Sequence, residues 1–327
     1  MPLTQLATEG VNTHVASSRN LASTTKTAPV WEDITPRWLL MLLPWKQIEA
    51  GKFRINQVAE QKPNGSKAKA VPGHPEASAE HAPMTDLEPT YAEFQADPNE
   101  FDLTTVQTIV EVDTRTADLY SVPFDQLNEQ LRLAINAIKE RKEYTVINGN
   151  IGLLRQASPK MRIPTIAGPP TPDDLDNLLA RVWKWPAFFV AHPQAIAAFG
   201  HECNARGVVL ESVAMFGVPF VTWRGVPMIP SNKVPITESA PRNKKARAKK
   251  ATETGGTTSI LLMRVGEERQ GVLGLHLAGV GDEKFQSLSI RFMGIDNQGV
   301  ARYLLTCYFS VTVLVPDALG VLESVKV

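Results

Sequence analysis

The fold of this chain is best predicted from residues 123–149, which read PFDQLNEQLRLAINAIKERKEYTVING. Apolar residues recur there at the spacing of one helical face, namely Phe124, Leu127, Leu131, Ala134, Ile135 and Ile138. Acidic residues come early and basic residues late, as the helix dipole prefers, and Asn148-Gly149 is a typical stop. The stretch predicts a spine-length helix of roughly 25 residues, about 37 Å long at 1.5 Å per residue.

Two strands are predicted on the N-terminal side of this helix. Residues 52–58 place Phe53 and Ile55 on one face, and residues 105–112 alternate in the same way. Each pattern is typical of a strand with one covered face. The segment between them, 60–102, holds six prolines and an excess of acidic residues. Because so long a loop is unusual inside a compact domain, it is either disordered or an extended arm that lies on something else.

Residues 1–30 are predicted to form a flexible arm, followed by a short helix at 37–43. Thr35 is the expected N-cap of this helix, and Pro44 the expected end. Its apolar residues need a surface to cover them: Trp38, Leu39, Leu40, Leu42 and Leu43. Docking within the chain and docking on a neighbouring subunit explain this cluster equally well.

A second block is predicted after the long helix. Its first helix begins at Thr171-Pro172-Asp173-Asp174, which combines a cap, a proline at the first position and two acids. A buried strand, a helix closed by Gly207 and two strands joined at Arg224-Gly225 follow, at 187–191, 193–206, 218–223 and 226–229. Later apolar runs predict four more strands, at 259–265, 271–277, 288–293 and 302–315.

The segment 231–258 is predicted to be a linker or surface loop, and it carries a basic run at 242–250. A nucleic acid or an acidic surface would be a suitable partner for such a run. However, the 34 Lys and Arg residues of the whole chain balance 34 Asp and Glu residues, and no aromatic residue alternates with the basic run. Since phosphate binding needs excess positive charge and base stacking needs aromatic rings, a solvated loop is the better interpretation.

The compartment is indicated by cysteine content and by hydropathy. Two cysteines in 327 residues form no disulfide framework, so a reducing cytoplasm fits best. The first 27 residues lack the apolar segment of a secretory signal. The longest apolar stretches, 38–43 and 303–315, are shorter than the roughly 20 residues of a membrane-spanning helix. We therefore expect neither a membrane partner nor a nucleic-acid partner.

A search for catalytic or metal-binding spacing finds none. No two histidines stand at i, i+4, no Cys-x-x-Cys occurs, and His201 and Cys203 would point to different faces of one helix. The glycines of 266–274 lack the Lys-Ser/Thr ending of a phosphate loop, and no Gly-x-Ser-x-Gly elbow is present. Three neighbouring acids are explained by their position at a helix start: Asp173, Asp174 and Asp176. We expect no catalytic residue, no metal and no cofactor, which favours a structural role.

Short segments spread over the chain form a recognisable series. They are KTAP (26–29), ITPRWLL (34–40), IEAGKFRIN (48–56), TSILL (258–262), RVGE (264–267), GVLGLH (271–276), YLLT (303–306), YFSV (308–311) and PDALGVL (316–322). In order and spread, this series resembles the shell proteins of encapsulins, especially the second of their families. No segment is a catalytic signature. The resemblance covers nearly all of the chain outside 1–25, 60–102 and 240–255.

The resemblance implies an α+β fold of the Hong Kong 97 bacteriophage capsid type. The implied parts are an N-terminal arm (1–45), an extended loop region with the long acidic insertion (46–120), a peripheral domain with the spine helix (121–186), an axial domain with the basic loop 240–256 (187–275), and a return to the peripheral domain (276–327). Closed shells need large interfaces between subunits, which extended arms provide.

The resemblance also implies site residues. In related shells the loop after the axial-domain helix lines the pore, which corresponds to Asn204 and Arg206 here. The arm and the extended loop imply contacts between subunits, through Trp38, Leu42, Phe53 and Ile55. The subunits would close into an icosahedral shell, which holds sixty copies in its simplest form.

A cargo enzyme is a further implication of the resemblance. It would be a cysteine desulfurase that uses pyridoxal phosphate, is held inside through its disordered N-terminal segment, and serves sulfur metabolism or storage. The shell itself would bind no pyridoxal phosphate. Some members of the group carry an inserted cyclic-nucleotide-binding domain of on the order of 100 residues. Because 231–258 is too short for that domain, we expect the branch without it.

Two other classes of function stay open at this stage. A phage or prophage major capsid protein would have the same fold, although the chain lacks a long removable scaffold-like segment. A hydrolase or lyase in an unfamiliar fold would need a convergent pocket with strongly shifted pKa values.

Overall fold

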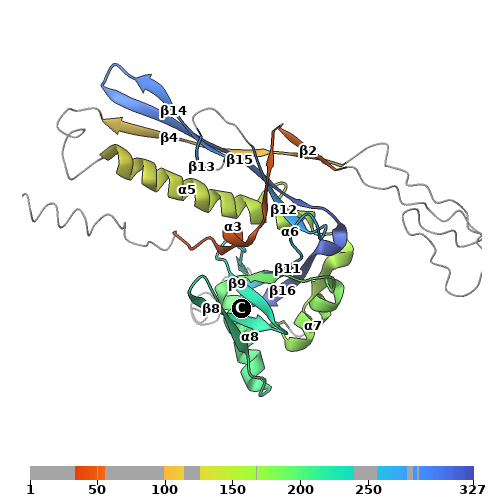
Figure 1. Cartoon of the computed structure of the whole chain (residues 1–327). Coiled ribbons are helices and arrows are strands. Elements are labelled where there is room, and N and C mark those ends of the chain that lie inside the picture. Colours follow the sequence, from red (N-terminus) through yellow and green to blue (C-terminus); the bar gives the residue numbers. More distant parts are fainter. Residues whose placement is uncertain are drawn as a thin grey trace, which may run out of the picture.

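A computed structural model describes residues 34–49, 51–55, 99–113, 126–166, 168–238, 256–277, 283–285 and 287–327. The predicted flexible arm 1–30, most of the acidic insertion and the basic run 242–250 lie outside the described residues. The described chain forms two large sheets, a two-stranded ribbon and several helices (Figure 1).

A long six-stranded sheet is built around β15 (Val300–Val313). Its strand order is β1-β12-β15-β14-β13, and β4 pairs with β15 over 300–309. The other members are β1 (Trp45–Ile48), β4 (Thr104–Asp113), β12 (Val272–Leu277), β13 (Glu283–Phe285) and β14 (Leu288–Ile295). Because β15 is longer than its neighbours, β14 and β12 share one of its edges, one after the other, and β4 lies on the opposite edge.

Helix α5 (Gln126–Asn148) lies along one face of this sheet (Figure 1). The predicted spine helix is therefore confirmed, and its apolar positions from Leu127 to Ile138 lie in the core or against it. Phe124 lies outside the described residues. The helix ends where Asn148-Gly149 was expected to end it, and the Gly149 N–H donates to the Thr145 carbonyl at 2.8 Å.

An eight-stranded sheet forms the second body of the molecule, in the order β5-β16-β11-β6-β9-β8-β7 with β10 paired to β11. Its strands are β5 (Arg162–Pro164), β6 (Phe188–Ala191), β7 (Glu211–Met215), β8 (Val218–Trp223), β9 (Val226–Pro230), β10 (Thr237–Glu238), β11 (Gly256–Met263) and β16 (Leu319–Lys326). Alternate residues of β6 enter two different cores. Phe188 and Val190 join the core of α5, and Phe189 and Ala191 join a second core. Burial on both faces explains the unbroken apolar runs in β6 and β11.

Helices α7 (Pro172–Arg181) and α8 (Pro193–Ala205) supply the second core. The predicted start of α7 is confirmed as a capping box. The Asp174 N–H donates to the Thr171 hydroxyl at 3.2 Å, and the Thr171 N–H donates to Asp174 at 3.0 Å. Gly207 follows α8 with φ +70°, a left-handed conformation that suits glycine.

The predicted strands are confirmed to within a few residues wherever the structure describes them. The β8–β9 turn has Arg224 and Gly225 at φ 50° and 79°, as a tight hairpin turn of the right twist requires. The sequence patterns did not identify β7 or β16 as strands, because neither one alternates cleanly or stands between clear turn residues.

The predicted cap of the first helix is wrong. Helix α3 (Trp38–Leu42) has Arg37 at its N-cap, with φ 56° and no side-chain cap. Thr35 instead donates its hydroxyl and its N–H to Glu140 on α5. A carboxylate on a distant helix thus outcompetes the local cap. Short elements elsewhere are α6 (Leu153–Gln156) and the 3-10 turns η2 (Pro159–Met161) and η4 (Pro316–Ala318).

The predicted domain boundaries do not coincide with the division of the chain between the sheets. β12 falls within 187–275 but pairs with β15 in the six-stranded sheet. α7 falls within 121–186 and β16 within 276–327, yet both belong to the eight-stranded sheet and its core. The chain crosses between the sheets several times, so consecutive ranges cannot follow them. The assignment of axial and peripheral domains stays a prediction.

Gly274 of β12 tests how firmly β1 is held on the six-stranded sheet. A Cβ at Gly274 would lie 2.6 Å from the Trp45 ring. That ring cannot retreat easily, because the Lys142 ammonium lies 3.7 Å from its centroid and its Nε1–H donates to the Leu40 carbonyl at 2.9 Å. We expect Gly274→Ala to destabilise the fold by about 1–3 kcal/mol, as overpacking does, measured as a lower thermal midpoint. Gly51→Ala, which has open space around the new Cβ, is the control; equal midpoints for the two variants would contradict the close packing.

Candidate assembly surfaces

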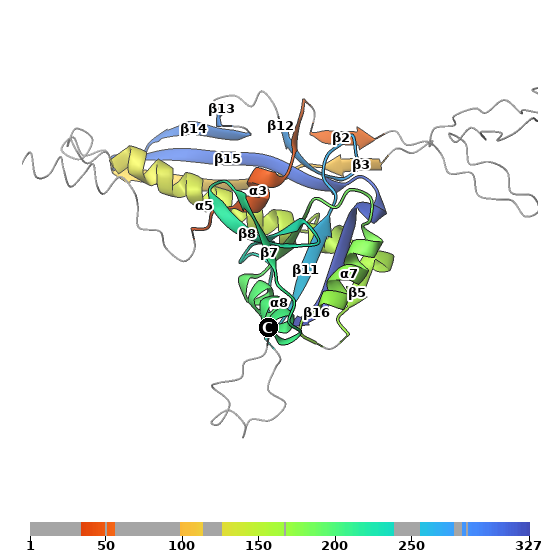
Figure 2. The same ribbon diagram turned by 60° about the horizontal axis from the view of Figure 1, so that its bottom comes forward.

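Helix α3 docks on the body of its own chain. Leu39 and Leu43 are buried, and the Trp38 ring stacks on Phe216 and meets Phe220 edge-on, with centroids 5.5 and 5.4 Å apart. Figures 1 and 2 show α3 between α5 and the eight-stranded sheet. Of the two docking modes left open by the sequence, the one within the chain is present. Leu42 also packs against this core, and contacts of Trp38 and Leu42 with another subunit stay a prediction.

A polar network ties three distant segments together at Glu140 of α5. The Thr35 N–H donates to Glu140 Oε1 at 2.9 Å, and Arg37 Nη1 donates to the same oxygen at 3.1 Å. Lys233 Nζ, from the loop after β9, lies 2.9 Å from Glu140 Oε2. The Lys233 carbonyl in turn accepts a hydrogen bond from Asn148 at 2.7 Å. Side chains of this network are largely buried, so each charge depends on its partners.

Glu143 lies one helical turn from Glu140 and is only 2% exposed. Burial, together with the negative charge of Glu140, raises the pKa of Glu143 from 4.5 to about 7. Lys233, the Leu39 N–H and the Thr35 hydroxyl oppose this rise without cancelling it. The segment before α3 therefore contacts, through Thr35, a carboxyl group that takes up a proton more readily than an exposed glutamate does. The sequence showed no signal for this site, because Glu143 stands among other charged residues of an ordinary helix face.

The ribbon of β2 (Lys52–Ile55) and β3 (Asn99–Asp102) is the described base of the acidic insertion. Phe53 packs against a small core that includes Leu273 of β12. Glu100 pairs with Lys52 and Arg54 on the other face. Ile55 is partly exposed and, unlike Trp38, Leu42 and Phe53, belongs to none of the described apolar cores.

The two predicted pore residues lie at the end of α8. Asn204 is exposed. Arg206 pairs with Asp173 at the start of α7 at 3.0 Å and lies 3.9 Å from Glu202. Val209, in the loop that follows, is 89% exposed. Arg206 thus positions the loop against α7, and a role of either residue in a pore stays a prediction.

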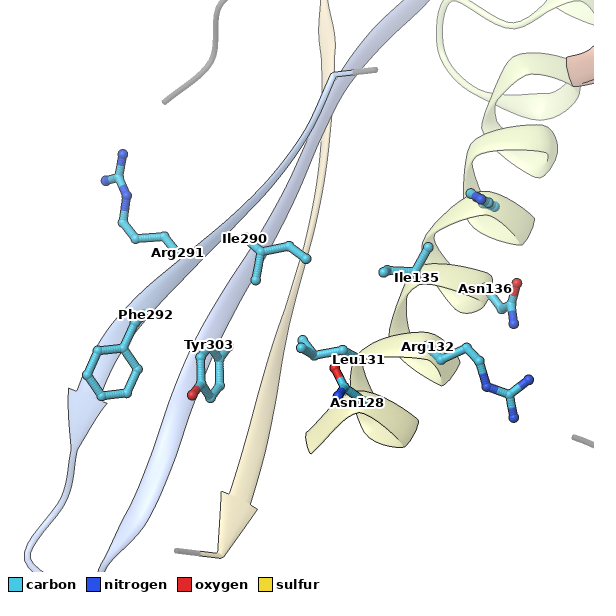
Figure 3. Close-up of a pocket in the computed structure, with 10 residues that line it drawn as sticks. Asn128, Leu131, Arg132, Ile135, Asn136, Ile290, Arg291, Phe292 and Tyr303 are labelled. Carbon is cyan, nitrogen blue, oxygen red and sulfur yellow. The ribbon is translucent and has the colours of Figure 1, made fainter. Parts of the chain in front are cut away.

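An open apolar surface lies at the outer end of the six-stranded sheet. Figure 3 shows Ile290 and Tyr303 of the strands facing Leu131 and Ile135 of α5 across a cavity of about 870 Å³. Phe292 lies beside Tyr303, with ring centroids 5.2 Å apart. Several large apolar residues near this end are more than half exposed in the single chain: Ile109, Phe292, Met293 and Ile295. Such a patch is typical of an interaction surface.

Two kinds of feature are absent from the described part of the chain, namely a metal-binding cluster and a membrane-spanning helix. No group of three or more His, Cys, Asp or Glu side chains there could hold a metal ion. No helix among the described residues is long and apolar enough to cross a membrane. The three acids near the start of α7 all have structural partners: Asp173 pairs with Arg206, Asp174 closes the capping box, and Asp176 accepts from Trp223 at 2.7 Å.

Comparison with known proteins identifies the family of the chain that carries these surfaces. The family model described as type 2A encapsulin shell protein, SrpI-like, matches residues 59–327. The chain belongs to this family. A type 2A encapsulin shell protein of Mycolicibacterium paratuberculosis is 46% identical over 312 residues, which cover 95% of this chain and 93% of the relative. This result confirms the resemblance to the second encapsulin family.

Solved structures confirm the fold. The cryo-EM structure of the holo-SrpI encapsulin complex from Synechococcus elongatus matches with a TM-score of 0.75 and 46% identity over 95% of each chain. The capsid of a native GTA particle matches with a TM-score of 0.56 over 88% of this chain, at 12% identity. The second likeness shows the fold alone. The α+β fold of the Hong Kong 97 capsid type is therefore the fold of this type 2A encapsulin shell protein.

Family membership decides between the classes of function left open by the sequence. The relatives that share 46% of its residues are named shell proteins, so the chain has a structural, non-enzymatic role. The capsid proteins of the phage class share the fold at about 12% sequence identity. The encapsulin shell proteins share both the fold and 46% of the sequence.

The buried Glu143 gives a pH dependence with a definite sign. Because its pKa is raised in the folded chain, the folded state holds the Glu143 proton more tightly than the unfolded state does. The resulting gain in the free energy of unfolding is complete below about pH 4.5 and is lost as the pH rises through about 7. The difference corresponds to about 3 kcal/mol. We expect the thermal midpoint of the wild type to fall between pH 5 and 8 by about 6 °C more than that of Glu143→Gln. Glu111→Gln, at an exposed carboxyl, is the control and should behave as the wild type does; parallel curves for wild type and Glu143→Gln would refute the raised pKa.

Proposed function

We propose that this chain is the self-assembling subunit of a closed icosahedral nanocompartment that encloses a cargo enzyme. The single observation that carries the proposal is 46% identity over 95% of the chain to the subunit of the holo-SrpI encapsulin complex. The shape of the subunit supports it, because α5, the six-stranded sheet and the β2–β3 ribbon project from the body and offer surface to neighbours (Figure 2). The simplest shell of this kind holds sixty copies.

The surfaces of the subunit fit separate roles in such a shell. We assign contacts between subunits to the β2–β3 ribbon around Phe53 and Ile55, to the α3 region around Trp38 and Leu42, and to the apolar outer end of the six-stranded sheet. We assign the lining of a pore to Asn204 and Arg206. Asn204 is exposed at the end of α8, and Arg206 pairs with Asp173 at the start of α7.

The proposed cargo is a cysteine desulfurase with a role in sulfur metabolism or storage. Pyridoxal phosphate would belong to this cargo, and the shell subunit would bind no cofactor. The proposed location is the bacterial cytoplasm. The family likeness supports these proposals indirectly, since the cryo-EM structure of the Synechococcus elongatus relative is of a holo complex.

Assembly itself is tested by the size of the purified particle. Sixty copies of a 35.9 kDa chain give a shell of about 2.2 MDa. We expect closed particles of this mass in negative-stain images and in sedimentation-velocity runs. Monomers or small oligomers under mild buffer conditions would refute the proposed function.

Ile55 tests the contact role of the β2–β3 ribbon. A buried carboxylate in an apolar interface is strongly unfavourable, so we expect Ile55→Glu to lower the assembled fraction at least five-fold while the far-UV circular dichroism stays that of the wild type. Gln47→Glu, at an exposed position of β1, adds the same charge nearby and should leave assembly unchanged. If Ile55→Glu assembles as fully as the wild type does, Ile55 does not lie in a contact between subunits.

The cargo is tested by mass spectrometry of particles purified from the native host. A cysteine desulfurase in stoichiometric amount, with the yellow colour of its cofactor, is the expected result. Empty particles, or particles with a different enzyme, would overturn the cargo assignment and leave the shell function intact.

A further inference from the structure

A second cavity, of about 910 Å³, lies where the loop between α7 and β6 meets the turn between β11 and β12. Two indoles line it, Trp183 and Trp185, which are 70% and 62% exposed. Indole rings are large and mostly apolar, and tryptophan is enriched at interfaces, so two exposed indoles side by side are typical of a binding surface. Trp185 also has φ 50°, a left-handed conformation that is strained for a bulky residue. The loop therefore holds both rings outward at a cost in stability.

The back of this cavity carries a guanidinium group with unused donors. Arg264 is 3% exposed, and its Nη2 donates to Asp317 at 2.9 Å. Its Nε and Nη1 have no hydrogen-bond partner among the described residues. Lys184 lies 3.3 Å from the other oxygen of Asp317, and Arg269 is a further cation of the lining. Three cations thus face two acids, Asp317 and Glu268, which leaves an excess of positive charge.

This chemistry selects a ligand with two features. A carboxylate complements the local excess of positive charge of this lining. Exposed indole faces are suited to flat or rigid apolar groups, and proline-rich segments dock into aromatic-lined grooves because they lose little entropy on binding. An acidic, proline-containing peptide offers both features, because its carboxylates match the excess of positive charge and its proline rings match the indole faces.

One segment of this chain has that composition. Residues 70–98 contain six acidic residues, five prolines and no Lys or Arg. Three places put a carboxylate directly beside a proline: Pro75-Glu76, Glu88-Pro89 and Asp97-Pro98. A shorter run of the same kind, at 169–176, holds three prolines and three acidic residues, but it leads into α7 and belongs to the described body.

The described base of the segment favours a different copy of the chain as the acceptor. β2 and β3 are paired, so the two ends of the segment 56–98 lie side by side. Figures 1 and 2 show this pair of strands directed outward from the body. Half of the segment, roughly 20 residues, can span about 60 Å when extended, which is sufficient to reach a neighbouring subunit.

We propose that the tryptophan cavity formed by Trp183, Trp185 and Arg264 receives the acidic, proline-containing segment 70–98 of a neighbouring copy of this chain. The inference rests on the proposed shell function, because it needs a second subunit at close range. It adds the acceptor surface and the chemistry of the contact.

Zero-length carbodiimide coupling on assembled full-length particles tests the contact, because it joins a lysine amine to a carboxylate only when the two touch. We expect a covalent dimer on a denaturing gel, in which mass spectrometry finds Lys184 joined to an acidic residue of 70–98. Coupling of Lys184 to Asp317 of the same chain serves as the internal control, since that pair is already 3.3 Å apart.

Two variants test the tryptophan rings and the lysine amine separately. Trp183→Ala combined with Trp185→Ala should lower the Lys184 link to 70–98 at least five-fold and leave the Lys184–Asp317 link unchanged. Lys184→Arg should abolish this dimer species, whereas Lys326→Arg, at an exposed lysine near the other end of β16, should not. Intact particles in which Lys184 is linked only to Asp317, or to 70–98 of its own chain, would overturn the inference. Absence of particles would instead refute the shell function on which it rests.

Discussion

Burial of α5 is the constraint on which the other parts of this structure depend. A helix of 23 residues with a long apolar stripe cannot be stable in water alone, because most helical stability comes from tertiary packing. Here β4, β14 and β15 cover the stripe, and the lower end of the same core reaches Val190 and Leu261 of the other sheet. The two sheets and α5 thereby share one core.

The charged side of α5 joins three segments of the chain through one glutamate. Glu140 accepts from Thr35 and Arg37 and pairs with Lys233, which joins the N-terminal segment, the helix and the second sheet at one point. Buried ion pairs contribute little net stability, since desolvation offsets most of the attraction. Their value here is geometric: the network accepts one arrangement of the three segments. Glu143 adds a pH dependence to that junction, because burial beside Glu140 raises its pKa to about 7.

The surfaces that remain open are those a multi-copy shell would use. The outer end of the six-stranded sheet leaves Phe292, Met293 and Ile295 more than half exposed, and the loop before β6 does the same for Trp183 and Trp185. A monomeric protein has little reason to keep such groups in water. In the family of type 2A encapsulin shell proteins these patches have an obvious use, since every subunit of a closed assembly meets several neighbours.

What the sequence by itself determined is the local structure: the length and end of α5, the capping box of α7, the turn at Arg224-Gly225 and the absence of catalytic spacing. Each depends on residues that are close along the chain, so periodicity and cap chemistry suffice to predict it. Tertiary structure alone decided that β12 and β16 belong to different sheets, that Thr35 serves Glu140 and not its own helix, and that Trp183 and Trp185 flank a buried arginine. Each of these facts arises from residues that are tens to hundreds of positions apart. Their proximity is set by packing of the whole chain, which no local pattern records.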